Sequence, residues 1–300
     1  ADTVVMAGGC GPCRFGYYAQ IQQAILKDLG CALQFIVLEP PQRQITELLV
    51  KIKQLAGSRS WWKIIQALRF GYRKARLVDE IERVALRSRP REKIPGSTDA
   101  AYRQALDLID CASSWEKLTA AQEKAKEIMD KVAVDFSRQV IKVGVVGEIY
   151  TLLEPFSNLY LERHLGGLGV EVHRSIYLSG WVNEHLFHGL AKGMGSGKEA
   201  RSASYPYLRH FVGGHGQETI GNAVRYARSG YDGIIQVFPF TCMPEIVAES
   251  ILPDVCKDFG VHYLTFIMDE NTGEAGMVTR LEAFTDLLAR KKEAKEALSS

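Results

Sequence analysis

Two segments of the chain carry cysteines in settings that favour chemistry. Cys10 and Cys13 form a Cys-Gly-Pro-Cys tetrapeptide that two glycines precede. Cys242 lies in the segment Phe-Pro-Phe-Thr-Cys-Met-Pro-Glu, residues 238–245. Two thiols two residues apart can form a redox dithiol, or two thiolates can bind one metal centre. The spacing of Cys10 and Cys13 alone leaves both chemistries open.

The elements around the first segment are predicted from hydrophobic periodicity. An apolar strand over residues 4–7 leads directly into the Cys-Gly-Pro-Cys tetrapeptide. Apolar residues then recur at helical spacing from residue 14 to 29, and a second apolar strand covers 33–38. Strand, loop, helix and strand in this order indicate the opening unit of an α/β fold, which we assign to residues 1–41.

The middle of the chain, residues 42–138, differs in character from both ends. It is rich in Lys, Arg and Glu, lacks strand alternation, and is predicted to be a helical region inserted into the α/β fold. Helical periodicity covers residues 44–56, 61–87, 98–111 and 115–137.

Residues 139–300 return to alternating strands and helices. This rhythm is typical of a parallel sheet with helices on both faces, so the predicted class is α/β, with Rossmann/flavodoxin-like parallel sheets and a helical insertion. The strands are expected at 141–147, 170–173, 233–238 and 262–267, and the helices at about 154–165, 181–192, 201–211, 217–228, 243–258 and 276–291.

The predicted topology places Cys10, Cys13 and Cys242 at comparable positions. Each cysteine loop follows the carboxyl end of a strand and precedes a helix, and ligands of such sheets bind at this edge. The helix N-terminus there also favours thiolate over thiol. We expect the three thiolates to form a metal site in which a cubane cluster keeps one iron free for substrate or a bridging sulfide.

Two alternatives remain open. Cys-Gly-Pro-Cys between strand and helix looks like thioredoxin, which would make Cys10 and Cys13 a thiol–disulfide oxidoreductase without Cys242. The chain is also compatible with a non-catalytic scaffold subunit whose metal is structural and whose helical region docks a catalytic partner.

The other cysteines are expected to have different roles. Cys31, placed at the start of a strand, and Cys256, on the apolar face of a helix, are predicted to be core residues. Cys111 lies near a helix end and would be a fourth ligand if the helical region folds over the site.

Four polar positions accompany the cysteine loops. His215 lies between two glycines ahead of a helix, where it would act either as a proton donor to the site or as a helix cap. Glu218 and Glu245 fall in first helical turns and are interpreted as complements of the helix dipole. Asp269 begins the acidic segment Asp-Glu-Asn-Thr-Gly, for which an Asx turn is favoured over a divalent-ion site.

Four segments together resemble the 2-hydroxyacyl-CoA dehydratase superfamily, in particular its activase-related proteins, which are similar to the double-cubane cluster proteins. These segments are residues 8–18 (Gly-Gly-Cys-Gly-Pro-Cys-Arg-Phe-Gly-Tyr-Tyr), 213–218 (Gly-Gly-His-Gly-Gln-Glu), 238–245 and 268–276 (Met-Asp-Glu-Asn-Thr-Gly-Glu-Ala-Gly).

The resemblance implies iron–sulfur clusters held between Rossmann-like domains, with Cys10, Cys13 and Cys242 matching the family's cysteine loops. It also implies that an ATP-dependent iron–sulfur activator protein delivers electrons for the reduction or dehydration of a small substrate or thioester. Larger relatives carry further cysteine motifs, which here would come from a partner or from sequence preceding Ala1. The expected assembly contains a larger partner subunit or is a homodimer.

Composition excludes several other classes of partner. The chain of 300 residues has 37 Lys and Arg against 35 Asp and Glu, a net charge of +2, which argues against a nucleic-acid partner. Its apolar runs are shorter than the roughly 18 residues of a membrane helix, and a signal peptide is lacking, so a cytoplasmic protein without a membrane partner is expected. The chain begins with Ala1, which suggests a processed end or a piece of a longer polypeptide.

Overall fold

The chain is an α/β protein, as the sequence predicts. The computed structural model describes residues 2–8, 14–38, 45–57, 59–185 and 197–299. In chain order its elements are β1 (Thr3–Ala7), the 3-10 helix η1 (Arg14–Tyr17), α1 (Tyr18–Asp28), β2 (Gln34–Leu38), α2 (Ile45–Leu55), α3 (Trp61–Ser88), the 3-10 helix η2 (Arg89–Arg91), α4 (Ser97–Cys111), α5 (Trp115–Asp130), β3 (Ile141–Gly147), α6 (Ile149–Leu153), α7 (Leu161–Gly167), β4 (Val170–Arg174), α8 (Leu178–His185), α9 (Gly197–Ser204), α10 (Gly216–Arg228), β5 (Gly233–Pro239), α11 (Met243–Phe259), β6 (His262–Met268) and α12 (Glu274–Ser299).

The main sheet has four parallel strands in the order β4-β3-β5-β6. The register pairs Val143 of β3 with Gly233 of β5 and ends with Gly147 beside Val237. The chain first steps from β3 to β4 on one side and then places β5 and β6 on the other. The strand order therefore reverses between β3 and β5, which is the topological switch point of the Rossmann/flavodoxin-like arrangement.

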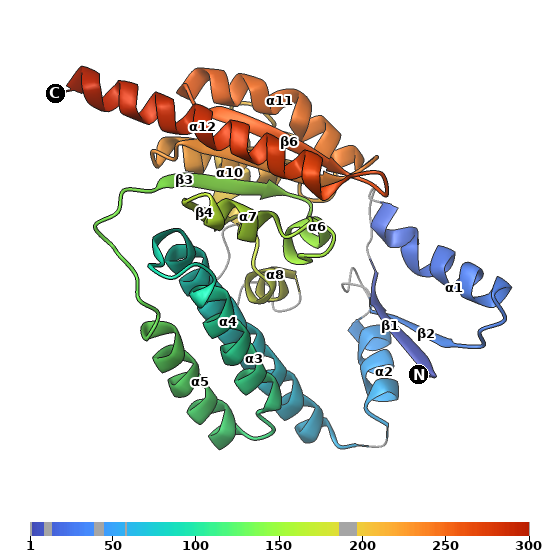
Figure 1. Ribbon diagram of the computed structural model, residues 1–300. Helices are drawn as coiled ribbons and strands as arrows, with labels where there is room; N and C mark the ends of the chain where they lie inside the picture. The colour runs from blue at the N-terminus through green and yellow to red at the C-terminus, as the bar shows by residue number, and fades with distance from the viewer. Residues whose placement is uncertain (1, 9–13, 39–44, 58, 186–196, 300) are drawn as a thin grey trace.

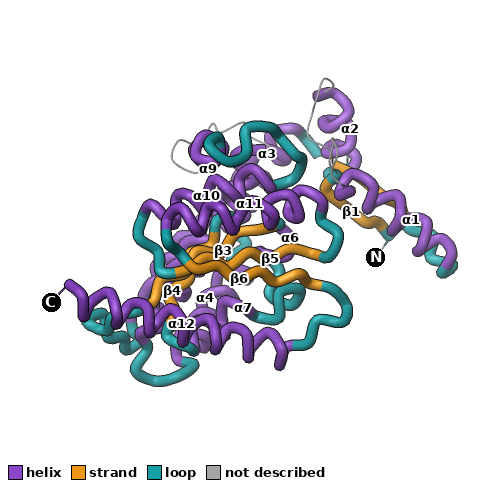
Figure 2. Tube along the Cα trace, turned by 90° about the horizontal axis from the view of Figure 1, so that it is seen from above, coloured by secondary structure: helices purple, strands orange, loops and turns teal. Residues whose placement is uncertain are grey.

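Helices cover both faces of this sheet (Figure 2). On one face, α12 packs through Met277, Leu281, Phe284 and Leu288 in a core that also includes apolar residues of α6, α7 and the strands. On the other face, α10 and α11 share a second core with Val146 and Ile234. The strands are apolar on both sides because each side faces a helix layer.

Residues 2–55 contribute a separate two-stranded parallel sheet in which β1 pairs with β2. Figures 1 and 2 show this N-terminal unit, with α1 and α2, on the side of the body toward which the carboxyl ends of the main strands point. The amide of Gly8 donates to the carbonyl of Leu38 at 2.7 Å, which holds the carboxyl ends of β1 and β2 together.

Helices α3, α4 and α5 have a core of their own, built from residues such as Leu77, Ala105 and Ala125. Its attachment to the sheet combines an apolar contact, Leu86 of α3 in the core of the sheet, with ion pairs. Buried Arg174 at the end of β4 pairs with Glu82 of α3 and with Glu162 of α7. Arg91 pairs with Glu171 of β4 at 2.6 Å, so β4 is the strand that carries the helical region.

Several predicted boundaries are wrong. The helix expected at 154–165 begins only at Leu161 and continues to Gly167 as α7, while the short helix α6 ends at Leu153. The chain between them is not helical: Leu159 and Tyr160 have positive φ, and the Asn158 side chain donates to the carbonyl of Thr151 and accepts from the amide of Leu161. Helix α5 ends at Asp130 instead of 137 and α8 begins at Leu178 instead of 181, while α9 spans Gly197–Ser204 instead of 201–211.

None of the helices that the structure describes is both long and apolar enough to cross a membrane.

The Arg91–Glu171 pair predicts a pH-dependent attachment of the helical region. Hydrogen bonds from His173 and Arg91 lower the pKa of Glu171 from 4.5 to about 2. A lowered pKa means that the carboxylate stabilises the fold above about pH 4.5, and that this contribution is lost as pH falls through about 2. Glu171→Gln is therefore expected to lower the free energy of unfolding by about 1–3 kcal/mol near neutral pH and by less near pH 3.

Urea unfolding of both proteins at several pH values measures this difference. If the difference in free energy of unfolding between wild type and Glu171→Gln stays constant down to about pH 3, the lowered pKa of Glu171 is contradicted.

Candidate functional site

Cys242 lies at the carboxyl end of β5, next to the switch point. It is half-buried and occupies the N-cap position of α11, directly before Met243. Its amide donates to the carbonyl of Pro239 at 3.1 Å, and its carbonyl accepts from the amide of Ile246 at 2.9 Å. The positive end of the helix dipole favours a thiolate in this position.

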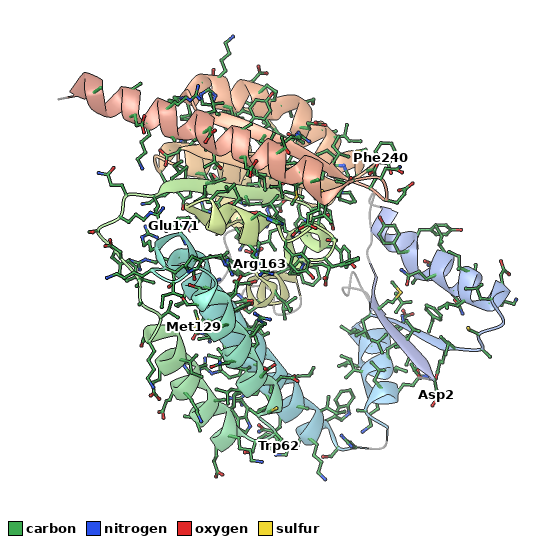
Figure 3. All side chains as sticks on the ribbon, in the orientation of Figure 1. Asp2, Trp62, Met129, Arg163, Glu171 and Phe240 are labelled. Carbon is green, nitrogen blue, oxygen red and sulfur yellow. The ribbon has the colours of Figure 1, made fainter. Side chains whose placement is uncertain are left out.

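The loop that carries Cys242 has an unusual backbone. Thr241, a β-branched residue, has a φ of 65° in the left-handed region, which such residues rarely adopt. The amide of Phe240 donates to the carbonyl of Met268 at 2.8 Å and ties the loop to the end of β6. Figure 3 shows Phe240 on the side of the body that faces the N-terminal unit, and its side chain is 65% exposed. The loop is thus a fixed turn at the sheet edge, and strain of this kind is common at functional sites.

The glycines around His215 pack directly against the segment that follows Cys242. A Cβ on Gly216 would lie 2.4 Å from the carbonyl oxygen of Pro244, and one on Gly214 would lie 3.1 Å from its ring. Only residues without a side chain allow this approach. Two segments that are far apart in sequence, residues 213–218 and 238–245, are therefore brought together. His215 occupies the N-cap position of α10, although its side chain makes no capping hydrogen bond there.

Glu245 lies in the first turn of α11, as expected, but it is also fully buried, which the sequence did not indicate. Thr219 donates to one carboxyl oxygen at 3.0 Å and Gln236 to the other at 3.0 Å. Burial raises the pKa of Glu245 to about 7. The side chain therefore connects β5, α10 and α11 beneath the Cys242 loop.

Glu148, which was not predicted as a site residue, follows β3 at the other side of the switch point. Its carboxylate accepts from the amide and hydroxyl of Thr151, at 3.0 and 2.9 Å, and so caps α6. Its charge contributes to the raised pKa of Glu245. Its position in the sequence could have indicated it, because it directly follows Gly147 at the end of an apolar strand. Ligands bind at the ends of the strands that flank a switch point.

A cavity of about 530 Å³ opens at the carboxyl end of β4, lined by α3, α8, α9 and α10. His215 and Glu218 form part of its wall. Glu218 does lie in the first turn of α10, but it also pairs with Arg201 at 2.8 Å. The cavity and the Cys242 loop therefore meet at the glycine segment.

The remaining predicted residues fall into three groups. Cys10 and Cys13 lie outside the described residues, so their predicted role as ligands is untested. Cys256 is 2% exposed, as predicted for a core residue. Cys111 ends α4 and is exposed, next to Asp110, whose carbonyl accepts from Lys74 of α3. It lies at the end of α4 opposite to Ser97.

The prediction for Cys31 is wrong. Gly30 has a φ of 76°, and the amide of Cys31 donates to the carbonyl of Leu26 at 2.9 Å, which closes α1. Cys31 is thereby placed in the turn before β2, outside the strand, and it is exposed.

The acidic segment after β6 is an Asx turn, as favoured from the sequence. The Asp269 carboxylate accepts from the Asn271 amide at 3.0 Å and from the Thr272 hydroxyl at 2.7 Å. Among the residues that the structure describes, no three or more His, Cys, Asp and Glu side chains form a group suited to a metal ion. Within the described part of the chain, Cys242 is thus one thiol at a sheet edge and not a complete ligand set.

Comparison with known proteins adds no assignment. No protein-family model matches the sequence, and no curated protein sequence matches it significantly. The function is therefore proposed from the chemistry and placement of the residues.

The packing of the glycine segment against Pro244 yields a direct test. Gly216→Ala places a methyl group against a backbone carbonyl that cannot move freely, and is expected to lower the free energy of unfolding by about 1–3 kcal/mol. Gly276→Ala is the matched control, because Gly276 also lies in the first turn of a helix but has nothing within 4 Å of the added carbon. Thermal and urea unfolding compare the two, and equal stabilities would show that the two segments do not touch.

Proposed function

We propose that the chain binds a cubane-type iron–sulfur cluster through Cys10, Cys13 and Cys242 at the carboxyl edge of its sheets. In this role it would accept low-potential electrons from an ATP-dependent iron–sulfur activator protein and reduce or dehydrate a small substrate. A larger partner subunit or a second copy of the chain would complete the assembly.

The observation that carries the proposal is the position of Cys242. Cys242 is half-buried, occupies the N-cap position of α11 and lies beside the switch point between β3 and β5. Cys256, in the same helix, has the setting of a purely structural cysteine. It is enclosed by apolar residues, and burial raises the pKa of its thiol to about 12. Thiolates are the ligands of iron–sulfur clusters, so the setting of Cys242 fits a ligand and that of Cys256 does not.

The N-terminal unit supports the proposal by its topology. β1 is parallel to β2 and ends at Ala7, three residues before Cys10, while η1 begins at Arg14, one residue after Cys13. Cys10 and Cys13 thus belong to a strand-to-helix connection, like Cys242. The described elements of this unit, β1, α1, β2 and α2, lie on the side toward which the main strands end (Figure 1).

When bound, a cubane cluster supplies a low-potential centre for one-electron transfer. The residues of the chain would contribute the surroundings of that chemistry. His215, at the wall of the cavity, would supply a proton to the substrate, and the cavity would hold the substrate away from bulk water. Glu245 would keep β5, α10 and α11 in register beneath the cysteine loop.

Anaerobic purification followed by iron and sulfide analysis tests the proposal. The wild-type protein is expected to contain iron and inorganic sulfide and to show the absorption of thiolate-bound iron. Cys242→Ala is expected to lose or alter this cluster, because it removes one of three proposed ligands. Cys256→Ala, on the same helix, and Cys31→Ala, an exposed position, are expected to keep it.

Two results would contradict the proposal. One is a colourless protein after reconstitution with iron and sulfide. The other is a metal-free protein with a reversible Cys10–Cys13 disulfide whose activity survives Cys242→Ala, which would make the chain a thiol–disulfide oxidoreductase. A cluster that has four protein ligands and cannot be reduced by dithionite would instead support the scaffold role.

A further inference from the structure

The cavity beside His215 has a distribution of charge that indicates its ligand. Three arginines and four glutamates line it, so the wall is strongly polar but nearly balanced in charge. Some of these groups are already paired with one another: Arg225 binds Glu199 at 3.0 Å and the Asn222 side chain at 3.1 Å. The groups that remain determine which molecule the cavity would bind.

On the wall formed by α3, the remaining groups are cationic. Arg83 stacks on the ring of Tyr177 at 3.8 Å, and no carboxylate of the described residues lies within ion-pair distance of it. Arg76 lies two helical turns earlier on the same face, and its ion pair with Glu80 is long, at 3.9 Å. Its Nε is buried without a hydrogen-bond partner among the described atoms. Guanidinium groups in this state favour a carboxylate, which they bind with two parallel hydrogen bonds.

On the walls formed by α8 and α10, two carboxylates line the cavity, Glu184 and Glu218. Glu184 accepts from the amide of Gly197 at 2.7 Å, and Glu218 is only partly satisfied. Arg201 donates to Oε1 of Glu218 at 2.8 Å, while Oε2 is buried and has no hydrogen-bond partner among the described atoms. Burial raises the pKa of this carboxyl group. An unsatisfied buried acceptor costs about 1–3 kcal/mol, and a cationic donor in the cavity would offset that cost.

We infer that the cavity binds a small zwitterion of the amino-acid type, its carboxylate on Arg76 and Arg83 and its ammonium group on Glu218. A simple anion would offer Glu218 no cationic partner, and a simple cation would offer the two arginines no anionic partner. A zwitterion satisfies both walls and adds no net charge to a nearly balanced site.

Size and lining are consistent with such a ligand. The volume of about 530 Å³ falls in the range of small-molecule sites and exceeds the needs of the amino and carboxyl groups alone. Ile176, Tyr177 and Trp181 add apolar surface that would accommodate a side chain. The position of α3 is fixed at this point, because Asp79 accepts from the amide of Ser179 at 2.9 Å. The two charged walls are therefore held in place before a ligand enters.

Binding of the zwitterion does not require the proposed cluster, whereas its role as the substrate rests on the proposed function. The two can fail separately, because binding is measurable on protein prepared with and without iron.

The test is calorimetric titration and thermal-shift measurement with the common amino acids on the full chain. We expect saturable binding of at least one of them, and affinities lower by about tenfold or more for its N-acetyl and its amide derivative. Arg83→Gln is expected to weaken binding by about tenfold or more, while Arg69→Gln, an exposed position on α3 outside the cavity, leaves it unchanged.

Glu218→Gln separates the two halves of the inference. This variant is expected to bind the amino acid more weakly than wild type does. Its affinity for the corresponding acid that lacks the amino group is expected to stay unchanged. Circular dichroism and unfolding curves show that each variant is folded. The inference is overturned if no amino acid binds the wild type, if Arg83→Gln and Glu218→Gln bind as wild type does, or if the corresponding 2-hydroxy acid binds as tightly as the amino acid.

Discussion

The architecture depends on the close approach of β3 and β5 at their carboxyl ends. Gly147 ends β3 with a φ of 140°, and a Cβ there would lie 1.9 Å from the carbonyl oxygen of Val237. The same oxygen accepts from the amide of Glu148 at 3.1 Å. Any other residue at position 147 would push the strands apart at the point where their order reverses. A glycine at this position thus keeps the switch point closed, and the loops that follow each strand begin from fixed positions.

Two groups of residues extend from this point. After β5 the strained turn at Thr241 places Cys242 at the start of α11, and Pro244 receives the glycines that flank His215. Glu245 accepts hydrogen bonds from Gln236 of β5 and Thr219 of α10 and so connects the strand to the helix. After β4, the loop toward α8 meets α3, which brings Arg83 into the wall of the cavity. The helical region therefore contributes to the candidate site, since its helix α3 forms one charged wall of the cavity.

The sequence predicted the elements better than the environments of individual residues. Strands such as 141–147 and helices such as 98–111 are evident because period and apolar run depend on local residues. The exposure of Cys31 and the burial of Glu245 were not predicted, because the exposure of a residue depends on which layer covers it, and no local pattern indicates this. The cavity was also beyond prediction, because its walls come from α3 and α10, which are more than a hundred residues apart. His215 was found through its flanking glycines, whose packing partner, Pro244, only the structure shows.

The central claim is that Cys242 is a cluster ligand at the carboxyl edge of the sheet. The most direct measurement is X-ray diffraction from anaerobically grown crystals, with anomalous data collected at the iron absorption edge. The account predicts an anomalous peak for iron bonded to Sγ of Cys242 and to the thiolates of Cys10 and Cys13. Iron bound elsewhere, with the Cys242 thiol packed against protein atoms alone, would contradict it.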